Sequence, residues 1–334
     1  MNMRVSRIKL TVVGMSVLTV LLFLFDMGSG SVRIPAREVV NALIGNECDA
    51  ATRAIVVNIR LVKALVALVA GAALSVSGLQ MQTLFRNPLA GPYVLGISSG
   101  ASLGVALFVL GAPLAGIAGT WMWIGTAGAA WIGSVAVLAL MAVVSARLKD
   151  IMVVLILGMM VSSGISAVVQ ILQFLSREDA LKSYVLWTMG SLSSVTSGQL
   201  AVLVPAIIIG LVIAFATVKP LNMLLFGEEY ATTMGLNLRR ARGFIFSSTT
   251  LLAGTVTAFC GPIGFIGLAM PHVARMLTDS ADHRALVPVS MLCGSAAVLL
   301  CDILASSFTL PVNAMTALLG IPVVIYVLFK AARG

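Results

Sequence analysis

Residues 151–175 read IMVVLILGMMVSSGISAVVQILQFL, a run without a single charged side chain. A helix needs about 20 mostly apolar residues to cross the hydrocarbon core of a membrane, and this run exceeds that length. In lipid the backbone polar groups must bond within the segment, which favours a helix over an open strand. The run also lacks the alternation of apolar and polar residues that marks the strands of membrane barrels. It therefore predicts a transmembrane helix.

The composition of the whole chain extends this conclusion. Hydrophobic residues make up 60% of the 334 positions, charged residues only 10%, and the mean hydropathy is +1.08. Soluble domains carry about 25% charged residues because their surface must be hydrated. This chain has too few charges to cover a water-facing globule, so we expect an integral membrane protein.

Similar runs with few or no charged residues recur along the chain and predict an all-α, polytopic membrane protein with about ten transmembrane helices. Two prolines, Pro262 and Pro271, interrupt one of these runs. We treat residues 1–334 as a single transmembrane domain. The expected spans are 9–28, 64–84, 93–111, 120–145, 151–175, 199–218, 243–260, 262–277, 285–306 and 312–329.

The basic residues indicate how these spans are oriented. Cytoplasmic loops carry an excess of Lys and Arg over outside loops. Ten spans with both termini in the cytoplasm place two thirds of the 21 Lys and Arg residues on the cytoplasmic side. This topology accounts for the net charge of +9 without nucleic acid as a partner, and membrane lipid surrounds the spans.

The longest cytoplasmic connection, 219–242, has the pattern of two short helices joined by a glycine. Carboxylates are favourable near a helix N-terminus, as at Glu228 and Glu229 after Gly227, and Gly235 is typical of a helix end. Three arginines follow at Arg239, Arg240 and Arg242. Spacing alone leaves two interpretations open, an ordinary amphipathic surface turn and a docking element for a soluble partner.

Polar and small residues interrupt several spans at membrane depth. Gly96, Gly100 and Gly104 recur every four residues and predict a face on which a neighbouring helix can approach closely. Gln80, Gln82, Ser98 and Ser99 would be costly in lipid, so we expect them to face protein or a wet cavity.

The fifth span combines methionines with small hydroxyls. Flexible methionine side chains beside serines suit the wall of a pathway for a bulky, partly apolar solute. Packing of neighbouring helices through the small residues is the alternative, and both interpretations stay open. The candidate pathway residues are Met159, Met160, Ser162, Ser163 and Gln170.

Three blocks of sequence resemble one known family. Residues 82–90 read QTLFRNPLA and 95–101 read LGISSGA. Residues 261–275 read GPIGFIGLAMPHVAR, followed by DHR at 282–284 and ALLGIP at 317–322. These blocks resemble, in family order from about residue 60 onward, the permeases of ATP-binding cassette importers for iron chelates, haem and cobalamin.

The resemblance implies a homodimer of ten-helix subunits in the cytoplasmic membrane of a bacterium, with the pathway at the dimer axis. It implies two copies of a separate ATPase and a periplasmic or lipid-anchored binding protein. By the same likeness the coupling element for the ATPase includes Gly227, Glu228, Glu229, Gly235, Arg239, Arg240 and Arg242. The cytoplasmic gate would comprise Arg86, Asn87, Pro88 and Leu89, with Asp150 in the turn at 147–151.

The family docks its binding protein through outward basic residues, and Arg60 and Lys63 match that pattern. Lysine lacks the bidentate fork of arginine, so the contact at Lys63 should differ in shape. Ser306 stands where the family has another arginine, and Thr309 and Asn313 also depart from the family pattern. Asp302 thereby loses an expected neighbour, and the sequence suggests no other partner for it.

Several kinds of site are missing from the sequence. Lys never follows Gly, so the chain has no phosphate loop of its own, and ATP and magnesium would bind to a partner subunit. We expect no enzymatic activity, bound cofactor or metal site, because His272 and His283 are the only histidines and the four cysteines lack ligand spacing. An ion-driven secondary transporter is the rival reading, with Asp302 as its one candidate ion site, and a membrane enzyme is the third. The sequence leaves open which chelate is carried.

Overall fold

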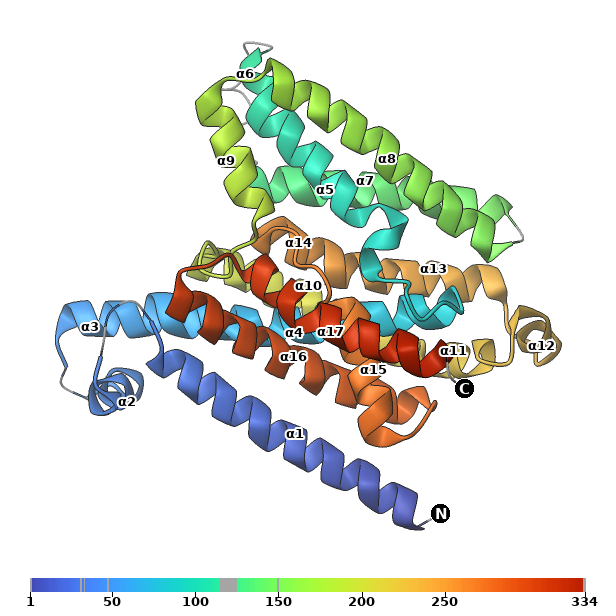
Figure 1. Cartoon of the computed structure of the whole chain (residues 1–334), viewed down its shortest axis with the longest axis horizontal. Coiled ribbons are helices and arrows are strands. Elements are labelled where there is room, and N and C mark those ends of the chain that lie inside the picture. Colours follow the sequence, from blue (N-terminus) through green and yellow to red (C-terminus); the bar gives the residue numbers. More distant parts are fainter. Residues whose placement is uncertain are drawn as a thin grey trace. The chain divides into compact units, whose positions relative to one another are not determined.

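The computed structural model describes residues 2–30, 32, 34–46, 48–114, 125–148 and 150–332, and every regular element in these ranges is a helix (Figure 1). The basic residues Arg33, Lys149 and Arg333 lie outside the described residues, as do positions 120–124 of one expected span. The chain divides into two compact units, each assembled from segments far apart in sequence. Unit 1 comprises Met1–Val76, Ser191–Pro205 and Ile263–Gly334, and unit 2 comprises Ser77–Gly190 and Ala206–Pro262.

The helices of unit 1 are α1 (Asn2–Gly28), α2 (Ala36–Ile44), α3 (Ala50–Ile55), the π-helical turn η1 (Val56–Arg60), the first part of α4 (Leu61–Leu84), the first part of α10 (Ser197–Ala216), α15 (Ile266–Thr278), α16 (His283–Phe308) and α17 (Val312–Ala332). Unit 2 holds the rest of α4 and α10, together with η2 (Pro92–Leu95), α5 (Ile97–Ala106), η3 (Leu107–Gly111), α6 (Ala112–Leu114), α7 (Gly125–Arg147), α8 (Ile151–Leu175), α9 (Glu178–Thr188), α11 (Val218–Leu224), α12 (Glu228–Thr233), α13 (Leu238–Thr249), η4 (Thr250–Gly254) and α14 (Thr255–Cys260).

Within the described residues, eight helical stretches are long and apolar enough to cross a membrane, and they confirm a polytopic all-α membrane protein. They are Arg7–Gly28, Ala50–Leu84, Gly125–Ser145, Ile151–Leu175, Ser197–Ala216, Leu238–Cys260, His283–Phe308 and Val312–Lys330. The other two expected spans, 93–111 and 262–277, correspond to shorter helices, Ile97–Gly111 and α15. The total of ten spans therefore stays a prediction.

Unit 1 is built around α16, most of which is buried. Helices α1, α15 and α17 pack against it, and α15 also packs against α17. A glycine on each helix lets α4 and α16 approach closely, because a Cβ atom at Gly71 would overlap the backbone of Gly294. The Ser295 hydroxyl donates a 2.7 Å hydrogen bond to the Leu68 carbonyl across the same contact.

Unit 2 confirms the close approach predicted from the glycines at four-residue spacing. Helix α5 packs against α7, and a Cβ atom at Gly100 would lie 2.5 Å from the Gly133 carbonyl oxygen. The buried amide of Gln80 donates to Thr217 at 3.1 Å and accepts from Thr249 at 3.2 Å. The expectation that Gln80 faces protein is confirmed.

Candidate functional site

The segment 219–242 folds as short helices separated by glycines. Helix α12 begins at Glu228, directly after Gly227 at φ 101°, as the sequence predicted. The predicted helix end at Gly235 is also confirmed, with φ 86° and a 2.9 Å hydrogen bond from the Leu236 amide back to the Ala231 carbonyl. Both glycines have left-handed backbone conformations that a side chain would strain.

An ion pair fixes α12 against α13. One terminal nitrogen of Arg242, Nη2, donates to both carboxylate oxygens of Glu228, at 2.7 and 2.8 Å, in a charge-assisted contact. Its other terminal nitrogen donates to the Leu148 carbonyl at 3.1 Å, just beyond the end of α7. Arg242 is buried and Glu228 is half-buried, so this pair holds α12 against α13 on the buried side of the segment.

The outer surface of the segment carries both charge and exposed apolar area. Glu229, Arg239 and Arg240 are exposed. Phe226 and Tyr230 are 69% and 70% exposed, and Leu225 and Met234 are exposed beside them in sequence. We call Leu225, Phe226, Tyr230 and Met234 the apolar patch. Sequence reasoning missed it, although two aromatic residues in a short segment between spans are a visible signal.

A cavity of about 580 Å³ joins the segment to the start of α8. Asp150, a predicted gate residue, lines it together with Glu228, Glu229, Arg239 and Arg242. Asp150 also caps α8 by accepting a 2.8 Å hydrogen bond from the Met152 amide. The structure thus brings this part of the predicted gate next to the predicted coupling residues.

The other predicted gate residues form a tight turn after α4. Arg86 has a left-handed backbone at φ 46°, and the Asn87 side chain accepts a 2.9 Å hydrogen bond from the Leu89 amide. Arg86, Pro88 and Leu89 are exposed. The Arg86 guanidinium lies against Gly227, so this turn also contacts the coupling segment. The gating role itself stays a prediction.

Helix α8 carries a polar stripe on an exposed face. We use this name for Ser163, Ser166, Gln170 and Gln173, whose spacing of three and four residues places them on one side of a helix. The first three are exposed and Gln173 is half-buried, and the exposed Met159 lies one turn before Ser163 on the same side.

Two other predicted pathway residues lie off the polar stripe. Met160 is 65% exposed beside it. Ser162 is half-buried, and its hydroxyl lies close to Gly96, so it faces the turn that precedes α5. The structure therefore separates Ser162 from the exposed members of the predicted set.

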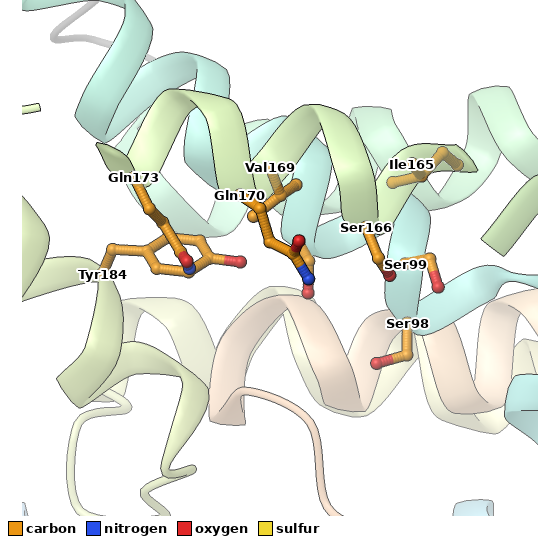
Figure 2. Close-up of a pocket in the computed structure, with 9 residues that line it drawn as sticks. Ser98, Ser99, Ile165, Ser166, Val169, Gln170, Gln173 and Tyr184 are labelled. Atoms are coloured by element: carbon orange, nitrogen blue, oxygen red, sulfur yellow. The ribbon is translucent and has the colours of Figure 1, made fainter. Parts of the chain in front are cut away.

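The part of the polar stripe toward the C-terminal end of α8 lines a second cavity, of about 250 Å³, between α5, α8 and α9 (Figure 2). Its lining includes Ser98 and Ser99, which the sequence placed against protein or a wet cavity. We call it the polar cavity. Its residues are Ser98, Ser99, Ser102, Ile165, Ser166, Val169, Gln170, Gln173 and Tyr184.

The predicted docking residues Arg60 and Lys63 are buried inside unit 1, at 4% and 6% exposure. Arg60 donates to the carbonyls of Met27 and Gly28, at 3.0 and 3.2 Å, and to that of Val32. It thereby binds the orphan carbonyls at the end of α1. Such burial does not support a role in contacting a partner protein. The docking role of Arg60 and Lys63 stays a prediction.

The expectation that Asp302 has no partner is wrong. The Lys63 ammonium lies 2.8 Å from the Asp302 carboxylate and 3.7 Å from that of Asp26, and it donates to the Ser306 hydroxyl at 2.9 Å. Asp26 and Asp302 are buried. Asp302 lies four residues before Ser306, one helical turn away, so both meet the same lysine. We call Asp26, Lys63 and Asp302 the charge cluster.

Comparisons with known proteins agree with this architecture. The sequence model of the FecCD transport family matches residues 18–330. The hemin transport system permease protein HmuU of Yersinia pestis is 37% identical over 82% of this chain and 82% of its own length. The vitamin B12 import system permease protein BtuC of Salmonella paratyphi A is 37% identical over 82% of this chain and 83% of its own length.

A solved structure described as an inward-facing conformation of a metal-chelate type ABC transporter has a TM-score of 0.82 and 29% sequence identity. The match covers 96% of this chain and 98% of that one. The family match spans nearly the whole chain, and the helices that could cross a membrane lie within or overlap it. The chain therefore belongs to the FecCD transport family, as a multi-pass protein of the cytoplasmic membrane.

Proposed function

We propose that this chain is the permease subunit of an ATP-driven importer that carries a metal chelate into the cell. It works as a homodimer with two copies of a separate ATPase, and a periplasmic or lipid-anchored binding protein delivers the cargo. The named relatives support this, since they serve hemin and vitamin B12 transport and the solved structure is of the metal-chelate type. Ferric siderophores are a third candidate cargo.

The coupling segment is the observation on which the proposal depends most. The chain has no phosphate loop, so the energy of ATP hydrolysis must reach it through a contact with another protein. Around α12 an internal ion pair fixes the fold, while outward charges and the apolar patch stay exposed. Exposed aromatic and aliphatic side chains in a segment that also carries exposed charges are typical of a protein-binding surface. We assign this surface to the ATPase.

Movement at the coupling segment can reach the gate through direct contacts within unit 2. Arg86 lies against Gly227, and Asp150 shares a cavity with Glu228 and Glu229. A displacement of α12 by the ATPase would change both contacts. We therefore assign Arg86, Asn87, Pro88, Leu89 and Asp150 to a cytoplasmic gate that α12 operates.

The polar stripe of α8 supports a pathway along this helix. Serine and glutamine side chains that face lipid are costly, so an exposed polar stripe on an apolar helix indicates contact with water or another protein. In a homodimer with the pathway at its axis, the stripe would line that pathway.

Uptake into vesicles tests this function. The permease is reconstituted with its ATPase and binding protein, and labelled haem, a ferric siderophore and cobalamin are each offered with ATP or with only an ion gradient. We expect accumulation of one of them that depends on ATP. Uptake driven by the gradient without ATP would contradict the proposal and indicate a secondary transporter, with the charge cluster as its first candidate ion site.

A further inference from the structure

The polar cavity has a chemical character that the proposed function leaves unexplained. Hydroxyl groups reach it from α5 (Ser98, Ser99 and Ser102), and amide groups reach it from α8 (Gln170 and Gln173). Figure 2 shows the two glutamines on the side of α8 that faces Tyr184 and the serines. Hydroxyls and primary amides each both donate and accept hydrogen bonds, so the lining matches either kind of ligand group.

Several of these groups keep their hydrogen-bonding capacity. Within the described part of the chain, the side chains of Ser98, Ser99, Gln170 and Gln173 have no hydrogen bond to another protein group. Ser166 differs, because its hydroxyl donates to the Ser162 carbonyl at 2.9 Å. Polar groups at membrane depth that lack protein partners need water or a ligand.

None of the described residues that line the polar cavity carries a formal charge. Burial raises the pKa of the Tyr184 phenol, an effect that the Ser102 hydroxyl partly opposes. The phenol is therefore uncharged at neutral pH. A carboxylate placed here would meet no cation from the lining, and burying a charge without a partner is strongly unfavourable.

The size of the polar cavity limits what enters it. A volume of about 250 Å³ lies below the ~300–1,000 Å³ of sites that enclose a whole small molecule. One arm of a chelate fits, while the remainder would extend along the polar stripe. The cavity is thus suited to a peripheral group of the cargo.

We infer that the polar cavity is a subsite for an uncharged, oxygen-rich arm of the cargo, such as a hydroxamate, amide or hydroxyl group, so that the importer selects neutral chelates over anionic ones. This rests on the proposed function and adds the chemical class of the cargo. A ferric trihydroxamate and cobalamin, whose corrin periphery carries amides, belong to the selected class. Haem, with two carboxylates, and a ferric tris-catecholate, with three negative charges, do not.

The first test compares the four probes in the reconstituted complex with ATP. We expect a ferric trihydroxamate or cobalamin to accumulate, and haem and the ferric tris-catecholate to remain outside. Accumulation of an anionic probe with ATP would overturn the subsite while leaving the ATP-driven importer intact. Failure of all four probes with ATP would overturn the proposed function, and the subsite with it.

The second test uses variants of α8. Gln170→Leu with Gln173→Leu removes two amides and should raise the KM for the accumulated neutral probe about tenfold, as the loss of two neutral hydrogen bonds implies. Copurification of the ATPase with the double variant checks that the complex still assembles. Ile171→Leu, an apolar exchange on the exposed surface of the same helix, is the matched control. An unchanged KM in the double variant would overturn the subsite.

Discussion

Lys63 connects three helices of unit 1 through one ammonium group. It pairs with Asp302 on α16 and lies near Asp26 on α1, and all three side chains are almost fully buried. Neither carboxylate oxygen of Asp26 has a hydrogen bond within the described residues. The cluster therefore depends on Lys63, because without it two carboxylates would be buried together with no cation between them.

We predict that Lys63→Met destabilises the purified protein by about 3–5 kcal/mol, the usual effect of removing one partner from a buried ion pair. Thermal unfolding in detergent measures this. Lys63→Met combined with Asp302→Asn should recover part of the loss, since fewer unpaired charges remain. Lys182→Met, at an exposed lysine of α9, is the control. An unaltered melting temperature in Lys63→Met would show that the lysine is not a structural link.

Glu228 and Glu229 are neighbours in sequence with different surroundings. Glu228 forms the ion pair with the buried Arg242, whereas Glu229 is exposed. We predict that Glu228→Gln costs about 1–3 kcal/mol locally and sharply lowers ATPase copurification and uptake, because α12 loses its anchor. Glu229→Gln should reduce copurification only modestly, as expected for an exposed charge. Equal effects of the two changes would mean that the ion pair does not position α12.

At the scale of elements, the contact between α5 and α7 depends on glycine. A Cβ atom at Gly100 would lie 2.5 Å from the Gly133 carbonyl oxygen, so the helices would have to separate. We predict that Gly100→Ala destabilises the protein by about 1–3 kcal/mol through overpacking. Gly164→Ala on α8 meets no atom within 4 Å and should be neutral or slightly stabilising. Melting temperatures in detergent compare the two, and equal values would contradict the packing argument.

The apolar patch on the coupling segment leads to a prediction about binding. Exposed aromatic residues dominate protein interfaces, so Phe226→Ser with Tyr230→Ser should weaken binding of the ATPase at least about tenfold. Phe174→Ser is the control, since Phe174 is 89% exposed but lies at the end of α8 farthest from Asp150. Copurification of the ATPase gives the readout. Retention of the ATPase by the double variant would place the docking surface elsewhere.

At the scale of the whole molecule, the sequence predicted what depends on local pattern. The spans follow from bilayer thickness, and the helix start at Glu228 and the turn at Gly235 follow from helix-end preferences. The charge cluster was not predictable, because Asp26, Lys63 and Asp302 are far apart in sequence and meet only through packing. The burial of Arg60 was missed for the same reason, since its partners are carbonyls at the end of α1.

The short helix α15 decides where the C-terminus lies. With 13 residues α15 is shorter than a usual span, yet it packs against both α16 and α17. Before it begins, the Gly264 amide donates to the Asn313 side chain at the start of α17, at 2.9 Å. Arg275, near the end of α15, shares a cavity with Lys330, at the end of α17. Helices α15 and α17 therefore run in the same direction.

The start of α1 lies at that same end of unit 1, since Arg7 is 3.6 Å from Asp279, the residue after α15. We predict from this that both termini face the cytoplasm, where the excess of basic residues belongs. Fusions of a fluorescent protein and of alkaline phosphatase after Gly334 test it. The fluorescent fusion should be bright and the phosphatase inactive, while phosphatase inserted in the connection 189–196 should be active. An active phosphatase at the C-terminus would mean that α15 does not cross the membrane, leaving an odd number of crossings between the coupling segment and the end of the chain.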